Sequence, residues 1–253
     1  MDLAGKKIVI TGASSGIGLE VVKLLLNYDV QILAVGRNME MIPQDKKVFP
    51  LQCDIASEEG VDKVFEEAAE KLGGIDLFWA NAGYGYYEKF GTPDWNHIQS
   101  IFNTNVLSPY YSLQKLLAFS PGKKVSFLVT DSIVGQLEMP GYVLYVASKF
   151  AINGGMRSAQ YEMPENVTVS IIYPIATATK FFDRAGSSLK KAGPVQSSES
   201  CAHAIIKGIQ HDKKHIYPYR VWSLLNYILT VFPFLKTVLL KLKSKEMNRF
   251  LGN

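Results

Sequence analysis

The sequence predicts an α/β fold in which a doubly wound parallel sheet of about seven strands carries helices on both faces. Short apolar runs alternate with longer stretches of helical periodicity along most of the 253 residues. The apolar runs are continuous rather than alternating, which indicates strands that are buried on both faces. A glycine-rich turn joins the first apolar run to the first helical stretch, as in the opening unit of such a sheet.

The predicted strands, in chain order, are Lys7–Ile10, Gln31–Val35, Val48–Gln52, Ile75–Trp79, Lys124–Val129, Thr168–Tyr173 and His215–Tyr217. The predicted helices between them are Gly18–Asn27, Glu58–Leu72, Asp94–Phe119, Tyr142–Met163 and Ser198–His211. Right-handed crossovers between parallel strands produce the doubly wound arrangement, so we expect ligands at the carboxyl ends of the strands.

Length and composition limit the kinds of protein that this chain can be. We expect one domain over residues 1–219, because 253 residues suffice for a full core, and a helical extension over residues 220–253. The net charge of +4 gives no indication of nucleic-acid binding. The four histidines lack the spacing of metal ligands, so we expect no metal site.

The cysteines and the first residues bear on the cellular compartment. Cys53 and Cys201 are far apart in the sequence, which fits a reduced, intracellular protein. The segment Met1–Gly5 carries no apolar signal region. We therefore expect a cytoplasmic location.

The turn Thr11–Gly18 has glycines in the pattern G-x-x-x-G-x-G between a strand and a helix. Such glycines let the backbone approach a pyrophosphate, and the helix N-terminus offers unpaired N–H groups to the anion. A tight turn without a ligand is the alternative interpretation. The residues predicted to cradle the phosphates are Gly12, Ser14, Ser15, Gly16, Ile17 and Gly18.

Arg37 follows the second predicted strand, and no acidic residue occupies positions 36 to 38. An acidic side chain at this place binds the ribose 2′-hydroxyl of NAD, whereas an arginine accommodates the 2′-phosphate of NADP. The sequence therefore favours NADP(H), with NAD(H) as the second choice. An ordinary surface arginine is the alternative interpretation.

Two further strand ends are candidates for contacts with the adenosine half of a dinucleotide. Asp54 and Ile55 follow the third strand, where a side chain could hydrogen-bond the adenine. Asn81, Ala82 and Gly83 follow the fourth strand, where small residues let the backbone pass close to the ligand. Both stretches are equally compatible with local turns.

Tyr145 and Lys149 are four residues apart and lie on one face of a predicted helix, and Ser132 follows the preceding strand. A phenol titrates near pH 10, and a neighbouring ammonium lowers that pKa. Tyr145 could then exchange a proton with a carbonyl or alcohol oxygen, and Ser132 could hydrogen-bond the same oxygen.

These motifs together resemble the short-chain dehydrogenase/reductase family, over about residues 5 to 182. The matching residues are TGASSGIG at 11–18, NAG at 81–83, Asn105, Ser132 and YVASK at 145–149. The resemblance implies a Rossmann-like fold, and it implies Tyr145 as acid/base, Lys149 as its partner and ribose ligand, and Ser132 as the substrate-orienting hydroxyl. It also implies a water held by Asn105, nicotinamide contacts from Pro174, Thr177 and Thr179, and a homodimer or homotetramer.

The sequence departs from the family pattern at three positions. Ile175 follows Pro174 where the family usually has glycine, which leaves the path of that loop open. Ser15 stands where many NADP-using members carry a basic residue, so the preference for NADP rests on Arg37. Ala80 replaces an asparagine before Asn81, which is a mild change.

Apolar side chains are expected around the substrate, because they flank Ser132 and Tyr145 and follow Pro174. The candidates are Val134, Leu137, Met139, Tyr142, Phe181 and Phe182, with Tyr84, Tyr86 and Tyr87 at the mouth. Residues of this kind are equally ordinary in a core. The polar segment Asp183–Ser188 suits a lid.

The C-terminal part, residues 220–245, combines apolar residues at helical spacing with a cluster of lysines, and Pro233 is expected to start a second helix. A membrane-spanning helix needs about 20 apolar residues, and Pro233 and Lys236 make this segment a poor span. One interpretation is peripheral contact with the inner face of a membrane. The others are packing on the protein's own cleft or on a second subunit.

The function that follows is an NADP(H)-dependent oxidoreductase that interconverts a carbonyl and an alcohol on an apolar small molecule. An NAD-dependent alcohol dehydrogenase of the same family is the nearest alternative. A regulatory protein that binds the cofactor without catalysis is the alternative from another class, although such a protein would not need Tyr145 as an acid/base.

Overall fold

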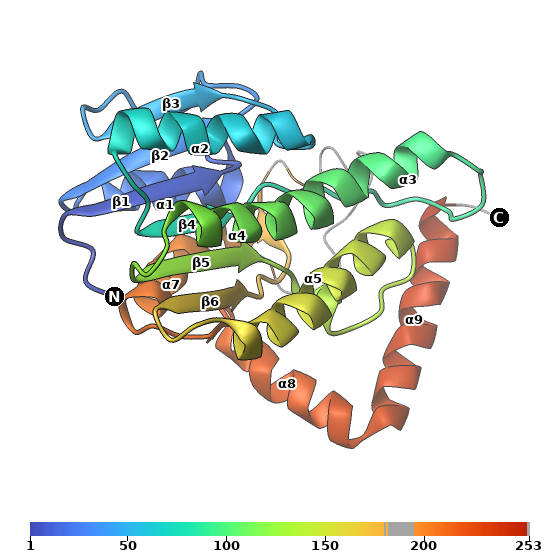
Figure 1. Cartoon of the computed structure of the whole chain (residues 1–253). Helices are drawn as coiled ribbons and strands as arrows, with labels where there is room; N and C mark the ends of the chain where they lie inside the picture. Colours follow the sequence, from blue (N-terminus) through green and yellow to red (C-terminus); the bar gives the residue numbers. More distant parts are fainter. Residues whose placement is uncertain (180, 182–194, 252–253) are drawn as a thin grey trace.

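The computed structural model describes residues 1–179, 181 and 195–251. Its centre is a seven-stranded sheet in the order β3-β2-β1-β4-β5-β6-β9, and each neighbouring pair is parallel (Figure 1). The strands are β1 Lys6–Thr11, β2 Val30–Gly36, β3 Val48–Gln52, β4 Leu77–Ala80, β5 Val125–Thr130, β6 Val167–Ile172 and β9 His215–Ile216. This confirms the predicted fold class and all seven predicted strands, with shifts of one or two residues at their ends.

The strand order reverses at β1, which pairs with β2 on one side and with β4 on the other. Ile8 is the register partner of Ile32 in β2 and of Leu77 in β4. In open α/β sheets the connections leave this switch point in opposite directions, which opens a crevice at the carboxyl ends of the strands. The glycine turn after β1 therefore lies at the place where such folds bind ligands.

Helices cover both faces of the sheet. The helices are α1 Gly16–Leu25, α2 Glu58–Leu72, α3 Trp95–Phe102, α4 Ser108–Phe119, α5 Val143–Glu162, α7 Ser198–Gln210, α8 Arg220–Val231 and α9 Pro233–Leu251. One core packs α2, α4 and α5 on the sheet, and a second packs α1 and α7 on the opposite face. Val9 belongs to the first core and its neighbours Ile8 and Ile10 to the second, so β1 is buried on both faces.

The predicted helix Asp94–Phe119 is not continuous. A π-helical turn, η1 Asn103–Leu107, separates α3 from α4. Its wider spacing directs the buried Asn105 towards the loop after β4, where its side chain hydrogen-bonds both backbone groups of Tyr84. Apolar periodicity is similar for α- and π-helical turns over so few residues, so the sequence pattern did not reveal the interruption.

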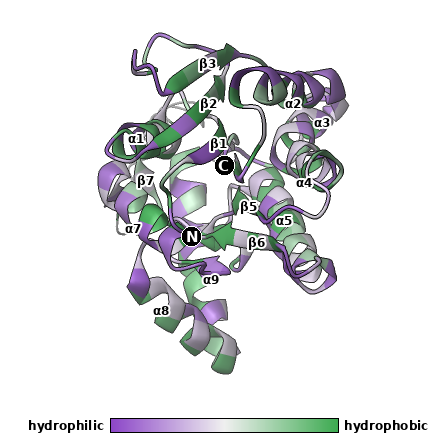
Figure 2. Ribbon diagram, turned by 60° about the vertical axis from the view of Figure 1, so that its left-hand side comes forward, coloured by the Kyte–Doolittle hydropathy of each residue, from purple (hydrophilic) through white to green (hydrophobic). Residues whose placement is uncertain are grey.

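The C-terminal helices form a V that projects from the body, as Figures 1 and 2 show. α8 is attached through Trp222 and Leu229, which pack on Leu137 and Ile175. α9 starts at Pro233, as predicted, and buries no residue. Of the helices in the described part of the chain, none is by itself long and apolar enough to cross a bilayer; α8 and α9 together reach that composition but are bent by 110°.

Two short strands, β7 Thr177–Ala178 and β8 Gln196–Ser197, pair with each other beside the main sheet. They follow the Pro174-Ile175 departure from the family pattern, and Thr177 Oγ1 donates to the Ile175 carbonyl at 2.9 Å. This bond and the β7–β8 pairing define the path of the loop in the absence of the usual glycine.

Candidate active site

An open cleft of about 350 Å³ lies at the carboxyl ends of the strands. That volume is in the range of small-molecule sites. The residues predicted to bind the cofactor that line this cleft are Gly12, Ser14, Ser15, Gly16, Ile17, Arg37, Asp54, Ile55, Asn81, Ala82, Gly83, Tyr145, Lys149, Pro174, Thr177 and Thr179. The fold therefore brings together residues that are spread over about 170 positions of the sequence.

The glycine turn is shaped by close backbone contacts. Gly12 has φ +65° and Gly16 has φ +56°, a region that side chains disfavour. A Cβ atom on Gly12 would lie 2.8 Å from the Ala82 Cα atom. Gly18 does not line the cleft; a Cβ atom there would lie 2.4 Å from the Gly12 carbonyl oxygen, so this glycine lets α1 start directly behind the turn.

A hydrogen-bond network joins the ends of β1, β4 and β5. The Thr11 hydroxyl accepts from the Asn81 and Ala82 amides at 3.0 and 3.1 Å. The Asn81 side chain donates to the Thr11 carbonyl at 3.0 Å and accepts from the Thr130 hydroxyl at 3.1 Å. The Asn81 side chain thus fixes the cleft floor, and the surface left to a ligand at this place is mainly backbone.

Arg37 and Asp54 flank the end of the cleft that the strand order assigns to adenosine. The Arg37 side chain is exposed and forms no ion pair within the described residues. Asp54 accepts from the Ala56 amide at 3.1 Å, which is the local turn contact considered as its alternative role. Arg37 is therefore available to an anionic group, whereas Asp54 is partly engaged.

Ser132, Tyr145 and Lys149 meet at the other end of the cleft. Ser132 caps the short 3-10 helix η2 Ile133–Gly135 after β5, where its hydroxyl accepts from the Val134 amide at 3.3 Å. Tyr145 and Lys149 stand one turn apart on α5, with the Lys149 Nζ atom 5.7 Å from the centre of the Tyr145 ring. The Nζ atom donates to the Thr130 carbonyl at 2.8 Å, which holds the ammonium under the ring.

Burial has the largest effect on the pKa values of Tyr145 and Lys149. It raises the pKa of Tyr145, and a hydrogen bond from Ser132 opposes that rise. Burial also lowers the pKa of Lys149, and the charge of Asp131 opposes that change. Burial thus outweighs the lowering of the Tyr145 pKa that the Lys149 charge alone predicts, and it favours the neutral phenol, which can donate a proton.

Asn105 supports the site from behind. Its amide donates to the Tyr84 carbonyl at 2.8 Å and to the Ser148 hydroxyl at 3.0 Å. A Cβ atom on Gly83 would lie 3.1 Å from the Asn105 Oδ1 atom and 3.7 Å from the Lys149 Nζ atom. Asn105 and Lys149 are thus neighbours across Gly83, and the water relay between them stays a prediction.

Aromatic rings form the wall beyond Tyr145. Its ring centre lies 5.5 Å from that of Phe181 and 6.3 Å from that of Tyr142, and Tyr142 lies 4.9 Å from Tyr87. The predicted substrate contacts that line the cleft are Val134, Met139, Tyr142 and Phe181, with Tyr84 and Tyr87 beside them.

Leu137 lies elsewhere, which corrects the prediction that it contacts the substrate. It is 2% exposed and packs with Ile175, Trp222 and Leu229 beneath α8. The chain turns after η2, so a residue between two cleft-lining positions points the other way. Tyr86 does not line the cleft either and packs on His97. Phe182 and the predicted lid Asp183–Ser188 are outside the described residues.

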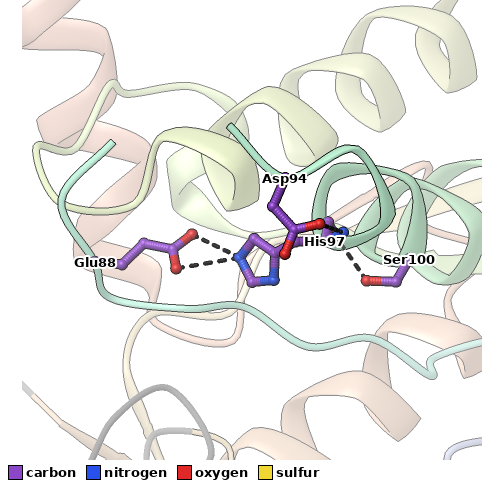
Figure 3. Close-up of polar contacts among 4 residues, drawn as sticks. All are labelled: Glu88, Asp94, His97 and Ser100. Carbon is purple, nitrogen blue, oxygen red and sulfur yellow. Dashed lines mark hydrogen bonds and ion pairs between the residues drawn. The ribbon is translucent and has the colours of Figure 1, made fainter. Parts of the chain in front are cut away.

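The loop that carries Tyr84 and Tyr87 is fastened to α3 (Figure 3). The His97 Nε2 atom lies 2.9 and 3.1 Å from the carboxylate oxygens of Glu88. Asp94 caps α3 by accepting from the His97 amide at 3.0 Å. These contacts hold the aromatic side of the cleft in place.

Two features of the site were not predicted from the sequence. Gly85 lies against the Tyr145 ring, because a Cβ atom there would come within 2.7 Å of it. Asp131 is 1% exposed beside Ser132; its carboxylate makes no well-formed hydrogen bond to the described residues, although the Ser132 amide and Asn153 are near enough to influence its pKa. Helix α9 lines the cleft mouth with Lys243, Glu246 and Phe250, which agrees with one interpretation of the C-terminal segment, its packing on the protein's own cleft.

Comparison with known proteins identifies the family. A model of the short chain dehydrogenase family matches residues 6–190. Sequence relatives include the 3-ketodihydrosphingosine reductase of Bos taurus, 30% identical over 72% of this chain and 59% of that protein. They also include the 3-dehydrosphinganine reductase of Danio rerio, 29% identical over 72% of this chain and 59% of that protein. The chain thus spans about three fifths of the length of these two relatives.

Solved structures agree at the level of the fold. A short chain dehydrogenase from Burkholderia cenocepacia in complex with NADP has a TM-score of 0.82 at 19% identity, with 95% of this chain and 99% of that chain covered. One from Burkholderia phymatum in complex with NAD has a TM-score of 0.81 at 18% identity, with 93% and 96% covered. The chain belongs to the short-chain dehydrogenase family.

Proposed function

We propose that the protein is an NADP(H)-preferring oxidoreductase that interconverts a carbonyl and an alcohol on an apolar small molecule. The proposal rests on the arrangement of the cleft. Ser132, Tyr145 and Lys149 converge at one end of it, and the glycine turn and Arg37 lie at the other end. The glycine turn fits a dinucleotide, because its glycines line the cleft directly before the N-terminus of α1, where backbone N–H groups can bind a pyrophosphate.

A bound nicotinamide would supply or accept the hydride. Within this chain, Tyr145 delivers the proton to the carbonyl oxygen during reduction and takes it back during oxidation. Ser132 hydrogen-bonds the same oxygen and orients it. Lys149, held by the Thr130 carbonyl, keeps a positive charge beneath Tyr145 and favours its phenolate once the proton has left.

The aromatic wall supports an apolar substrate. Tyr87, Tyr142 and Phe181 surround the space beyond Tyr145. Two of the relatives are named 3-dehydrosphinganine reductase and 3-ketodihydrosphingosine reductase. A long-chain ketone is therefore the first substrate to screen.

A paired titration with NADPH and NADH tests the cofactor part without a substrate. We expect NADPH to bind at least about tenfold more tightly, because Arg37 would pair with the 2′-phosphate. Arg37→Glu should weaken NADPH selectively, with Lys46→Glu as the control for a distant surface charge. Equal weakening of both cofactors would remove Arg37 from this role, and tighter NADH would favour the NAD-dependent alternative.

Tyr145→Phe tests the chemical step. We expect turnover to fall by about 100-fold or more, because the proton donor is lost, while the NADPH dissociation constant changes little. Turnover within a few-fold of the unmodified enzyme would contradict the assignment. Tight cofactor binding without turnover on any carbonyl would favour the regulatory alternative.

A further inference from the structure

The bend between α8 and α9 leaves large apolar side chains exposed. Tyr227 is 67% and Phe234 is 63% exposed. The exposed apolar residues grouped at this bend are Leu224, Tyr227, Val231, Phe232, Phe234 and Val238, which we call the elbow. Soluble proteins rarely leave such a group uncovered unless it binds something.

The same segment is strongly basic. Helices α8 and α9 together contain six lysines and arginines and one acidic residue, Glu246. Within the described residues, Lys236 pairs with Glu138 at 2.6 Å and Lys243 with Glu246 at 2.8 Å. The other basic side chains of α8 and α9 make no ion pair with any described residue, so their charge is available to an anionic partner.

Charge distinguishes between two candidate partners of the elbow, a second copy of the chain and a lipid surface. A twofold contact through the elbow would place two net basic surfaces against each other, and the charges would repel. An anionic bilayer matches both properties, because acyl chains accept the apolar side chains and headgroups accept the lysines.

The shape of the two helices suits insertion into one side of a bilayer without crossing it. The two helices project from the body and meet at 110°, so the elbow is the part of this region farthest from the sheet (Figures 1 and 2). We propose that the elbow inserts into the headgroup and upper acyl region of an anionic bilayer and holds the enzyme peripherally at its surface.

α9 connects the elbow to the catalytic cleft. One end of the helix carries Phe234, and the other lines the cleft with Glu246 and Phe250. The charge of Glu246 acts on both Tyr87 and Tyr142, which places it at the substrate end. The 19-residue helix is about 28 Å long, so a docked enzyme has its cleft mouth one helix length from lipid. This second step rests on the proposed function: an apolar carbonyl compound dissolved in the bilayer is the substrate source.

Vesicle flotation tests docking without cofactor or substrate. The full chain should float with vesicles of 70% phosphatidylcholine and 30% phosphatidylserine. Phe234→Ser combined with Val238→Ser should lower the partition coefficient by about tenfold or more, because two inserted side chains are lost. Trp95→Ser combined with Tyr161→Ser removes exposed rings away from the elbow and should float normally. Failure of the full chain to float, or equal loss in both pairs, would overturn docking.

Charge reversal tests the lipid specificity. Lys241→Glu combined with Lys245→Glu should reduce flotation on anionic vesicles by about tenfold, because each lysine near such a surface contributes about 1 kcal/mol. Lys46→Glu combined with Lys124→Glu is the control elsewhere on the surface. Equal binding to pure phosphatidylcholine would overturn the anionic part. A concentration-dependent dimer that the Phe234→Ser variant abolishes would assign the elbow to a second copy instead.

An activity assay tests separately whether the substrate reaches the enzyme from the lipid. The elbow variants should lose activity on a long-chain ketone held in vesicles and keep it on a short soluble ketone. Loss on both would show damage to the enzyme, and no loss on either would overturn delivery while docking stands. Inactivity of the unmodified enzyme on every ketone would overturn the proposed function and leave the flotation result unaffected.

Discussion

At the scale of single residues, Gly85 sets the position of the Tyr145 ring. A Cβ atom would come within 2.7 Å of the ring, so Gly85→Ala must displace either the loop or the phenol. We expect kcat to fall by about 10- to 100-fold, because a small misplacement of a reacting group is costly, while NADPH binding is retained.

Gly91→Ala is the matched control for Gly85→Ala, since a Cβ atom there meets nothing within 4 Å. Steady-state kinetics and an NADPH titration on both variants separate displacement of Tyr145 from unfolding of the loop. Unchanged kcat in Gly85→Ala would show that the ring is not held by this contact.

Asp131 makes the stability of the fold depend on pH. Burial raises the pKa of Asp131, opposed chiefly by the charge of Lys149, and the carboxylate in turn raises the pKa values of Tyr110 and Tyr173. A raised carboxyl pKa means that the native state binds more protons than the unfolded state, so this contribution to stability is present below about pH 4 and is lost as pH rises towards the raised pKa.

Asp131→Asn should remove the loss of stability that accompanies the rise in pH. We expect the variant to gain roughly 1–3 kcal/mol relative to the unmodified protein at pH 7.5, and less at pH 5. Urea unfolding at the two pH values measures the difference. A difference that is the same at both pH values would show that Asp131 does not titrate between them.

The residues proposed to be catalytic could be brought together from the sequence because each follows a strand end or shares a helix face with its partner. Chain order and the helical repeat of 3.6 residues placed Ser132, Tyr145 and Lys149 near one another, and the family resemblance implied their roles. Leu137 and Asp131 could not be placed in this way, because a turn between Ser132 and α5 decides which side chains face the cleft. Such turns depend on contacts with distant elements, here α8 and the loop after β6, whose Pro174 carbonyl accepts from the Ile133 amide.

At the scale of elements, local sequence patterns predict where strands and helices form, but they do not predict which elements pair or pack with one another. Ser57 caps α2 by accepting from the Gly60 amide at 3.2 Å, and Gly73 ends it with φ +65°. Both signals are visible in the sequence. The pairing of β1 with β4 and the π turn η1 depend on packing between distant segments, which no local pattern records.

Helix α9 is the element with the clearest functional test. Removal of residues 233–253 should open the cleft mouth, because Lys243, Glu246 and Phe250 line it. We expect KM for an apolar carbonyl substrate to rise by about tenfold, and the NADPH dissociation constant to change little, since the glycine turn is at the other end. Thermal stability should fall only slightly, because α9 buries no residue. A large rise in the NADPH constant instead would show that the truncation damages the fold.

At the scale of the whole molecule, exposed apolar side chains on the helices around Asn105 and Tyr145 fit the proposed homodimer or homotetramer. Leu107, Phe150 and Tyr161 are exposed on this surface. Light scattering should give at least twice the monomer mass, and Phe150→Lys combined with Tyr161→Lys should reduce it, because buried charges oppose association. A monomeric unmodified protein would contradict the proposal.

The direction of the strands gives the molecule two unequal edges. Every loop named in the cleft leaves a carboxyl strand end, whereas the exposed Lys123 lies in the turn before β5. A fluorophore, affinity tag or surface tether attached at Lys123 would therefore leave the proposed catalytic edge free. The protein could be immobilised in this way for single-molecule or biosensor work without blocking access to its substrate.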